Sequence, residues 1–319
     1  MSKVLVLGST GYVGSRLVER LIEQGYNVRA GWRTKNKLDE QPWKDYPKVN
    51  PVKVDVLDIE QLKQALAGCD IVYYLIHSMY SGSSFEELDR QAAENTIKAA
   101  DEEDIKRIIY LGGLGEESDR LSRHLRSRKE VERILRSGKT PVTTFQAAMI
   151  IGPGSASFEI MRYLVNRLPV MITPEWVRTK TQPISIEDTI QYLVGCLTKS
   201  ETLGETFDIG GPEVTTYQDL MTTYAFEAGL VKRFEFPIPL LTPSLSSYWV
   251  ELVTPVRATI ARPLIEGLSQ ETTCREHRIR EIIPRKLLTI KESIQQTLLE
   301  IDGSIYEKSV TRRTLFRLK

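Results

Sequence analysis

The first half of the chain alternates short apolar runs with amphipathic stretches. The apolar runs are rich in β-branched and aromatic residues and predict buried strands. They cover residues 3–8, 27–33, 51–58, 70–79, 107–115 and 140–154. The stretches between them carry apolar residues at helical spacing and predict helices at 12–25, 59–69, 85–105 and 123–136. This alternation indicates βαβ units and an α/β fold with a doubly wound parallel sheet, covered on both faces.

The pattern is less regular after residue 155. The expected elements are a helix at 157–168, a strand and a helix capped near Ser185 within 181–198, and a strand, turn and helix start within 205–221. From about residue 232 the composition changes, and the stretch 236–268 is apolar with five prolines. We therefore expect a nucleotide-binding domain at 1–231 and a smaller C-terminal substrate lobe or lid at 232–319.

A glycine-rich segment, GSTGYVG at 8–14, lies between the first expected strand and the first expected helix. Glycines at this spacing permit a tight turn, a close approach of the backbone to a ligand, and close packing of the helix on the strand. The helix N-terminus then offers free N–H groups to phosphate oxygens. The context predicts a dinucleotide phosphate site; the alternative is a tight turn without a ligand. The residues assigned to it are Gly8, Ser9, Thr10, Gly11, Tyr12, Val13 and Gly14.

The end of the second expected strand indicates which dinucleotide is bound. An NAD site usually carries an acidic residue there, which binds the ribose 2′-hydroxyl. This chain has GWRTKNK at 31–37, with no acid and with the basic residues Arg33, Lys35 and Lys37. The pattern favours NADP(H), with Arg33 pairing with the 2′-phosphate. NAD(H), or a solvated basic loop, is the alternative.

Ligands of doubly wound sheets bind at the carboxyl ends of the strands. We therefore expect Asp55 beside the adenine and His77 near the nicotinamide ribose. Catalytic and structural roles for His77 have equal weight at this point. The remaining residues expected in the same cleft are Val56, Leu75, Ile76, Gly112 and Gly113.

The expected helix at 123–136 reads RHLRSRKEVERILR and concentrates positive charge. His124 and Arg128 fall on the same stripe as Val131 and Leu135. Near the helix N-terminus this stripe should line the cofactor cleft, where Arg128 can contact the ribose or a phosphate. His124 could transfer a proton near neutral pH, and the charge of Arg128 should lower its pKa. The alternative is that His124 only forms hydrogen bonds in an inert cleft.

These segments resemble the short-chain dehydrogenase/reductase superfamily, in its atypical NmrA-like and YbjT-like branch of NAD(P)-binding proteins. The resemblance rests on GSTGYVG, on DVLD at 55–58, on the glycine-rich strand end at 111–115 and on SRKEVERIL at 127–135. It implies a Rossmann domain with a smaller substrate lobe. It does not name the substrate.

The resemblance also implies a catalytic set that this chain lacks. Active members carry Tyr-x-x-x-Lys on the helix after the fifth strand and Ser or Thr at that strand's end. Here His124 and Arg128 stand at the Tyr and Lys places, and Gly112 and Gly113 stand at the Ser place. Two functions remain open. One is an NADP(H)-dependent oxidoreductase or epimerase that uses His124, Arg128 and His77. The other is a non-catalytic NADP(H)-binding redox sensor or an assembly or accessory factor.

The composition excludes several classes of protein. A formal net charge of +1 over 319 residues argues against a dedicated nucleic-acid binder. Cys69, Cys196 and Cys274 have no metal-ligand spacing, and we expect buried thiols in a reducing, cytoplasmic compartment. No apolar run is long enough to span a membrane. The expected partner is a small-molecule substrate. Weaker expectations are a membrane surface or a protein, contacting 236–268 and the basic tail at 312–319.

Overall fold

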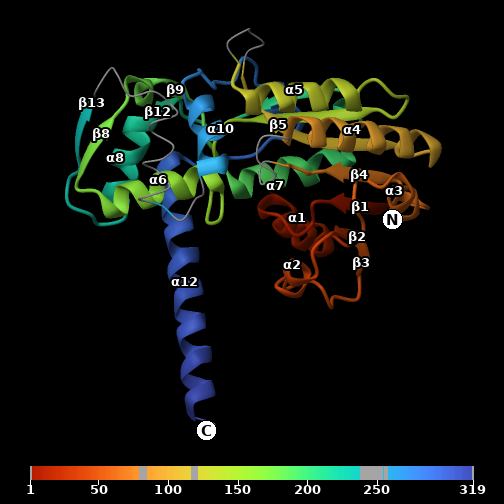
Figure 1. The fold of residues 1–319 in the computed structure, drawn as a ribbon, viewed down its shortest axis with the longest axis horizontal. Helices are drawn as coiled ribbons and strands as arrows, with labels where there is room; N and C mark the ends of the chain where they lie inside the picture. Colours follow the sequence, from red (N-terminus) through yellow and green to blue (C-terminus); the bar gives the residue numbers. More distant parts are fainter. Residues whose placement is uncertain (1, 79–84, 116–120, 238–253, 255–257, 318–319) are drawn as a thin grey trace.

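A seven-stranded parallel sheet forms the centre of the computed structural model, which describes residues 2–78, 85–115, 121–237, 254 and 258–317 (Figure 1). Its strand order is β11-β6-β5-β4-β1-β2-β3, which confirms the doubly wound fold. The strands are β1 (Lys3–Leu7), β2 (Asn27–Trp32), β3 (Val49–Lys53), β4 (Ile71–Tyr74), β5 (Arg107–Gly113), β6 (Val142–Ala147) and β11 (Thr206–Ile209). The order reverses between β1 and β4, and in such sheets a ligand cleft opens at that point.

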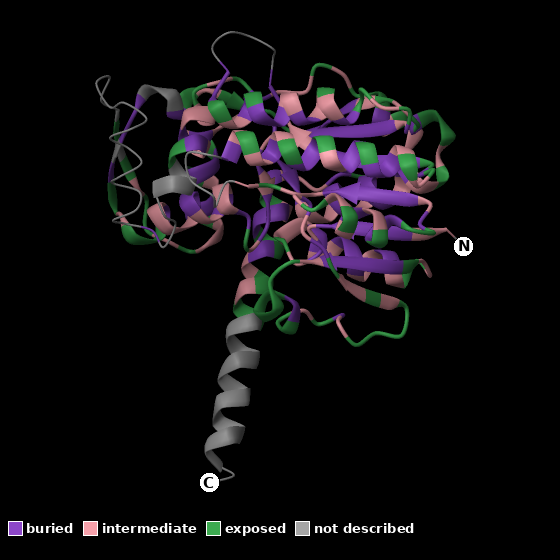
Figure 2. Ribbon diagram, turned by 45° about the vertical axis from the view of Figure 1, so that its right-hand side comes forward, coloured by how far each residue is buried: buried purple, intermediate pink, exposed green. Residues whose placement is uncertain are grey.

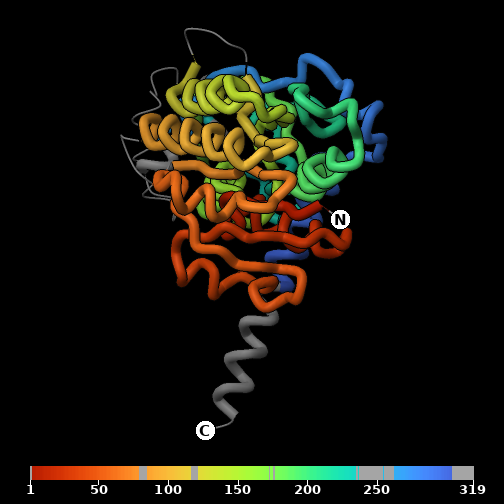
Figure 3. Tube along the Cα trace, turned by 90° about the vertical axis from the view of Figure 1, so that its right-hand side faces the viewer, coloured from red at the N-terminus to blue at the C-terminus, as the bar shows by residue number. Residues whose placement is uncertain are grey.

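Successive residues of a strand point to opposite sides of the sheet. The strands are apolar on both sides, and helices cover both faces. Val4 and Val6 pack in one apolar core, and Leu5 and Leu7 pack in another. The first core lies under α1 (Tyr12–Glu23) and α7 (Ile186–Gly195). The second lies under α3 (Ile59–Leu66), α4 (Phe85–Glu102) and α5 (Arg123–Leu135). Figure 2 shows the strands buried between these layers, and Figure 3 shows α4 and α5 side by side.

A third core lies beside the sheet and contains Phe158, Met161, Leu220, Tyr224 and Ile294. Its helices are α6 (Ala156–Arg167), α8 (Tyr217–Glu227) and the start of α12 (Ile290–Arg317). Short strand pairs surround it: β7 (Ile150–Ile151) with β10 (Ile184–Ser185), β9 (Lys180–Thr181) with β12 (Thr215–Thr216), and β8 (Val170–Thr173) with β13 (Phe234–Pro237). The smaller elements are α2 (Lys35–Asp39), α10 (Ala258–Leu268), α11 (Arg278–Ile282) and the 3-10 turns η2 (Glu175–Arg178), η3 (Cys196–Thr198) and η4 (Ser200–Thr202).

The C-terminal residues return to the sheet after leaving the third core. The Arg275 Nε lies 3.2 Å from the Asp208 carboxylate on β11, and Ile279 and Leu287 belong to the first core. Ser185 caps α7, as expected. Asp188, which follows it, is fully buried and pairs with Arg285 at 2.7 Å. The proposed boundary near residue 232 stays a prediction, and residues beyond it contribute to the sheet's own core.

Several local expectations need correction. The third strand covers 49–53 rather than 51–58, and the expected strand at 140–154 divides into β6 and β7. Residues 312–317 continue α12, which extends away from the rest of the molecule (Figure 1). Of the apolar stretch 236–268, residues 238–253 and 255–257 lie outside the described residues.

The three cysteines are free thiols. Cys69 and Cys196 are buried, as expected, whereas Cys274 is only half-buried. Among the described residues, no helix combines the length and the apolar composition needed to cross a membrane.

A buried arginine on β2 caps a helix, and this yields a stability prediction. The Arg29 guanidinium donates to the carbonyls of Ala65 at 2.6 Å and Ala67 at 3.0 Å, at the end of α3. Arg29→Met would leave these carbonyls without the donor, so we expect the free energy of unfolding to fall by about 1–3 kcal/mol. Urea melts followed by circular dichroism measure it. The matched control is Arg126→Met on the exposed face of α5, expected within about 0.5 kcal/mol of the parent. Equal losses in the two variants would contradict the capping role.

Candidate functional site

A cleft of about 790 Å³ lies at the carboxyl ends of β1, β2, β4 and β5. Its walls include the glycine loop, the starts of α5 and α6, and the side chain of Leu264 from α10. Most of the residues expected from the sequence line it: Gly8, Thr10, Gly11, Tyr12, Val13, Gly14, Arg33, Asp55, Val56, Leu75, Ile76, His77, Gly112, Gly113, His124 and Arg128. Ser9 is different. Its side chain is buried and donates to the carbonyl of Gly31 at 2.8 Å, so it ties the loop to β2 instead of facing the cleft.

The glycine loop has no room for side chains at two positions. Gly8 has φ +86°, and a Cβ there would lie 2.8 Å from the carbonyl oxygen of Leu75. A Cβ on Gly14 would lie 2.1 Å from the carbonyl oxygen of Gly8. The start of α1 can therefore lie this close to β1 only because residue 14 is a glycine. Gly11 is the N-cap of α1 and no side chain caps the helix. The N–H groups of its first turn are therefore available to an anion.

An exposed arginine lies where the cleft meets the carboxyl end of β2. Arg33 follows β2 directly, is exposed and has no ion-pair partner among the described residues. Lys35, by contrast, pairs with Asp39 at 3.2 Å. On the other side of the cleft, Asp55 is half-buried and accepts the backbone N–H of Leu57 at 3.1 Å.

A buried ion pair joins α4 and α5 beside the cleft. Arg128 Nη2 lies 2.8 Å from the Asp89 carboxylate, and the two side chains are 6% and 1% exposed. Asp89 also accepts from Ser127 Oγ at 3.0 Å and from the Ser78 backbone N–H at 2.9 Å. Arg128 Nη1 donates to the carbonyl of Ile76 at 3.1 Å. Its Nε is buried without a partner in the described structure, and the residue lines the cleft.

Asp89 is the functional residue that the sequence reasoning missed. It lies on α4, within a segment assigned simply as an amphipathic helix. The available indication was its position, because Asp89 falls on the same buried stripe as Phe85, Ala92, Ala93 and Thr96. An acid on one buried stripe and Arg128 on the next helix's stripe together indicate an ion pair.

His77 and His124 stack over this pair, with ring centroids 5.1 Å apart and an interplanar angle of 18°. Burial and the nearby charge of Arg128 lower the pKa of His124 to about 3. The direction expected from Arg128 is therefore present, but burial is the larger cause. Desolvation and Arg128 also lower the pKa of His77, although its side chain is exposed to the open cleft. His124 is neutral near pH 7, and its Nδ1 is buried without a partner among the described residues.

The glycines at the end of β5 follow from helix packing. A Cβ on Gly113 would lie 2.7 Å from Leu125 Cδ2 on α5, and one on Gly112 would lie 3.0 Å from the Tyr110 ring. A serine side chain at Gly113 would therefore displace the end of the Leu125 side chain.

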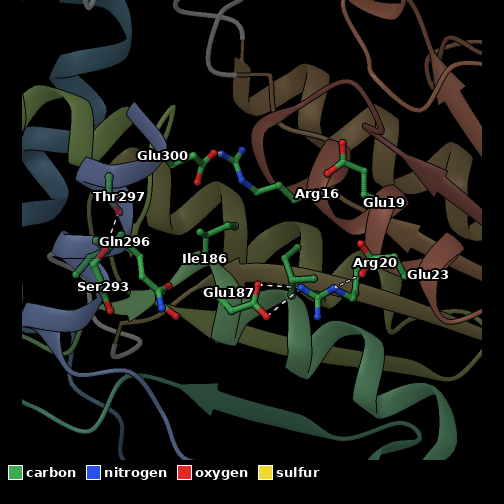
Figure 4. Close-up of a pocket in the computed structure, with 13 residues that line it drawn as sticks. Arg16, Glu19, Arg20, Glu23, Ile186, Glu187, Ser293, Gln296, Thr297 and Glu300 are labelled. Carbon is green, nitrogen blue, oxygen red and sulfur yellow. Dashed lines mark hydrogen bonds and ion pairs between the residues drawn. The ribbon is translucent and has the colours of Figure 1, made fainter. Parts of the chain in front are cut away.

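A second pocket of about 300 Å³ lies between α1, α7 and α12. Arg16 lines both pockets and pairs with Glu300 of α12 (Figure 4). Its guanidinium also donates a hydrogen bond to the carbonyl of Pro153 at 3.2 Å. Arg20, one turn further along α1, pairs with Glu187 of α7 at 3.1 Å. These ion pairs hold α1, the helix that follows the glycine loop, against α7 and α12.

The low pKa of His124 has a consequence for stability. In the unfolded chain a histidine titrates near 6.5, whereas in the fold His124 titrates at about 3. Between these values the unfolded state binds the extra proton, so stability must fall as the pH drops from about 6.5 toward 3. We expect urea melts at pH 7, 6 and 5 to lose stability more steeply in the parent than in His124→Gln. His277→Gln, which removes an exposed imidazole at the start of α11, is the control. Parallel slopes for the parent and His124→Gln would contradict the burial of this ring.

Comparison with known proteins agrees with this geometry. Residues 8–151 match the family model described as NAD(P)H-binding. Over 221 residues the chain is 27% identical to "NADH dehydrogenase [ubiquinone] 1 alpha subcomplex subunit 9, mitochondrial" of Arabidopsis thaliana, which covers 67% of this chain and 55% of that protein. Over 218 residues it is 25% identical to the "NADH-ubiquinone oxidoreductase 40 kDa subunit, mitochondrial" of Neurospora crassa, with 67% and 57% covered. The chain thus spans little more than half of these relatives.

Solved structures share the fold over nearly the whole chain. A nucleoside-diphosphate-sugar epimerase from Staphylococcus aureus has a TM-score of 0.73 at 16% identity and covers 92% of this chain and 100% of its own. A triphenylmethane reductase from Citrobacter sp. also has a TM-score of 0.73, at 17% identity, with 93% and 99% covered. The glycine loop and the family match over residues 8–151 therefore agree on an NAD(P)H-binding segment, and the whole chain has the fold of these epimerase and reductase structures.

Proposed function

We propose that the cleft binds NADP(H) in preference to NAD(H). The observation that carries this proposal is Arg33, an exposed guanidinium without an ion-pair partner in the described part of the chain, at the carboxyl end of β2. A rigid fork of donors suits a phosphate oxygen pair. An acid that would favour a ribose 2′-hydroxyl is absent from the segment 31–37.

The residues of the cleft fit such a cofactor. Gly8 and Gly14 carry no Cβ, so the backbone of the loop can approach a pyrophosphate closely. The start of α1, which no side chain caps, would donate its N–H groups to the same phosphates. The buried Nε of Arg128, which has no partner among the described residues, would offer a donor to the nicotinamide ribose. When bound, the cofactor supplies a hydride donor or acceptor. The chain itself binds, orients and shields it.

For the role of the bound cofactor, the site best supports a redox-sensing or accessory function. A proton relay needs a group that titrates near the working pH, and His124 has a pKa of about 3. Arg128 is held by Asp89 and keeps its charge, so it cannot exchange a proton. The two relatives named as subunits of respiratory NADH dehydrogenases support an accessory role of this kind.

A small-molecule oxidoreductase or epimerase is the second candidate. The observation that favours it is the length of the cleft, which continues past His124 to Ser157 on α6 and Leu264 on α10. In that case neutral His124 would position a substrate oxygen through a hydrogen bond from its imidazole. His77, whose side chain is exposed in the same cleft, would contact the same substrate.

Cofactor preference is tested by fluorescence titration of the purified protein with NADPH and NADH. We expect clear preference for NADPH, and we expect Arg33→Asp to weaken NADPH binding by about 10-fold to 100-fold while changing NADH binding little. Arg126→Asp, an equal change of charge on the exposed face of α5, is the control. Equal affinity for the two nucleotides would exclude the assigned role of Arg33. Absence of binding by any nicotinamide nucleotide would exclude the site.

The accessory and enzymatic roles differ in turnover. If the cofactor is sensed, NADPH should raise the melting temperature in proportion to the logarithm of its concentration, without being consumed in the presence of carbonyl or sugar-nucleotide substrates. If the chain is an oxidoreductase, NADPH oxidation should appear; if it is an epimerase, a sugar nucleotide should isomerise without net consumption of cofactor. In either case His124→Ala removes the donor to the substrate oxygen and should slow turnover by about 100-fold. Turnover that His124→Ala leaves unchanged would remove His124 from the mechanism. Turnover of any kind would contradict the purely accessory role.

A further inference from the structure

A small parallel sheet at the edge of the third core presents one apolar face to solvent. β13 pairs with β8 in a register that sets Phe234 opposite Val170. Paired residues, and residues two apart on one strand, point to the same side of a sheet. Val170, Phe234 and Phe236 therefore share a face, and their exposed fractions are 51%, 55% and 57%. We call these three residues the β8–β13 face.

The other side of the same sheet is buried. Met171, which alternates with Val170 on β8, is 2% exposed and belongs to the third core. The β8–β13 face therefore points away from the third core, and Figure 1 shows β8 and β13 at the edge of the molecule. Val231, three residues before Phe234, is 79% exposed and extends the apolar surface along the chain. Two adjacent phenylalanines left in water indicate a surface that is covered in use.

Cations border this face. Arg167 and Lys232 are exposed at the residues that lead into β8 and β13, and Arg233 is half-buried with its Nε on the carbonyl of Val165 at 2.8 Å. The Arg167 guanidinium lies over the Tyr163 ring, 5.1 Å from its centroid. Glu227, the nearest preceding acid in the described chain, is already paired with Lys291. Lys232 and Arg233 therefore place two cations at the start of β13, and the strand itself contains one acid, Glu235.

We propose that the β8–β13 face docks on the surface of an anionic lipid bilayer. Phenylalanine side chains enter the boundary between headgroups and acyl chains, while neighbouring Lys and Arg side chains reach the lipid phosphates. A second copy of the chain fits less well, because a two-fold contact through this face would bring the cations of both copies together. An acidic protein would satisfy the charges. A flat apolar face with cations on its border is the arrangement of interfacial membrane segments.

The test is flotation of the full chain with vesicles of equal parts phosphatidylglycerol and phosphatidylcholine, and with vesicles of phosphatidylcholine alone. We expect the protein to float with the anionic vesicles at low salt and to be released at about 0.5 M salt. Replacing Phe234 and Phe236 together by Ser should weaken binding by at least about 10-fold. Lys232→Gln, in an exposed segment, should weaken it by about fivefold.

Controls separate loss of docking from loss of the fold. Leu203→Ser and Val214→Ser remove exposed apolar side chains elsewhere and should bind vesicles as the parent does. Each variant must keep the parent's melting temperature and nicotinamide-nucleotide titration. If the double variant does not fold, Lys232→Gln decides. The proposal is wrong if the parent does not float, if both variants bind as the parent does, or if neutral and anionic vesicles bind equally. It is also wrong if the double variant only converts a dimer to a monomer.

Discussion

The ion pair between Arg128 and Asp89 is the constraint on which the α4 and α5 side of the cleft depends. Burying two charges costs several kcal/mol each unless both are paired and hydrogen-bonded. Here Asp89 accepts three donors and Arg128 reaches the carbonyl of Ile76, so the cost is largely met. The contacts join α4, α5 and the segment after β4. The pair therefore fixes this side of the cleft, while the low pKa of His124 comes mainly from burial and secondarily from the charge of Arg128.

The glycine loop and the sheet were predictable because they depend on local requirements. Gly8 needs a positive φ, Gly14 needs the space of a missing Cβ, and both are visible in the order of residues. The alternation of strands and helices likewise follows from apolar periodicity, which fixes the buried faces of the sheet. Arg33 could be placed because it follows a strand whose end the pattern already located.

Other features depend on contacts between distant segments and could not be predicted in the same way. Asp89 pairs with a residue 39 positions away, and the sequence gives no direct measure of that distance. The fall in the pKa of His124 depends mainly on burial, which arises only when α5 packs on the end of β5. The apolar β8–β13 face also depends on register. The sequence run around Phe234 and Phe236 indicates an apolar segment without showing which side faces the core.

The residues at the end of β5 and the start of α5 depend on one another. Gly113 lets Leu125 approach β5, and that approach brings α5 close to the sheet. Arg128 then lies where its charge can be neutralised by Asp89, and this charge, together with burial, keeps His124 neutral. A serine at Gly113 would displace the end of the Leu125 side chain, and a lysine at Arg128 could not reproduce the two directed contacts of the guanidinium. The end of β5 and the start of α5 therefore form one packed arrangement, in which the Arg128–Asp89 pair and the neutral imidazole of His124 are compatible.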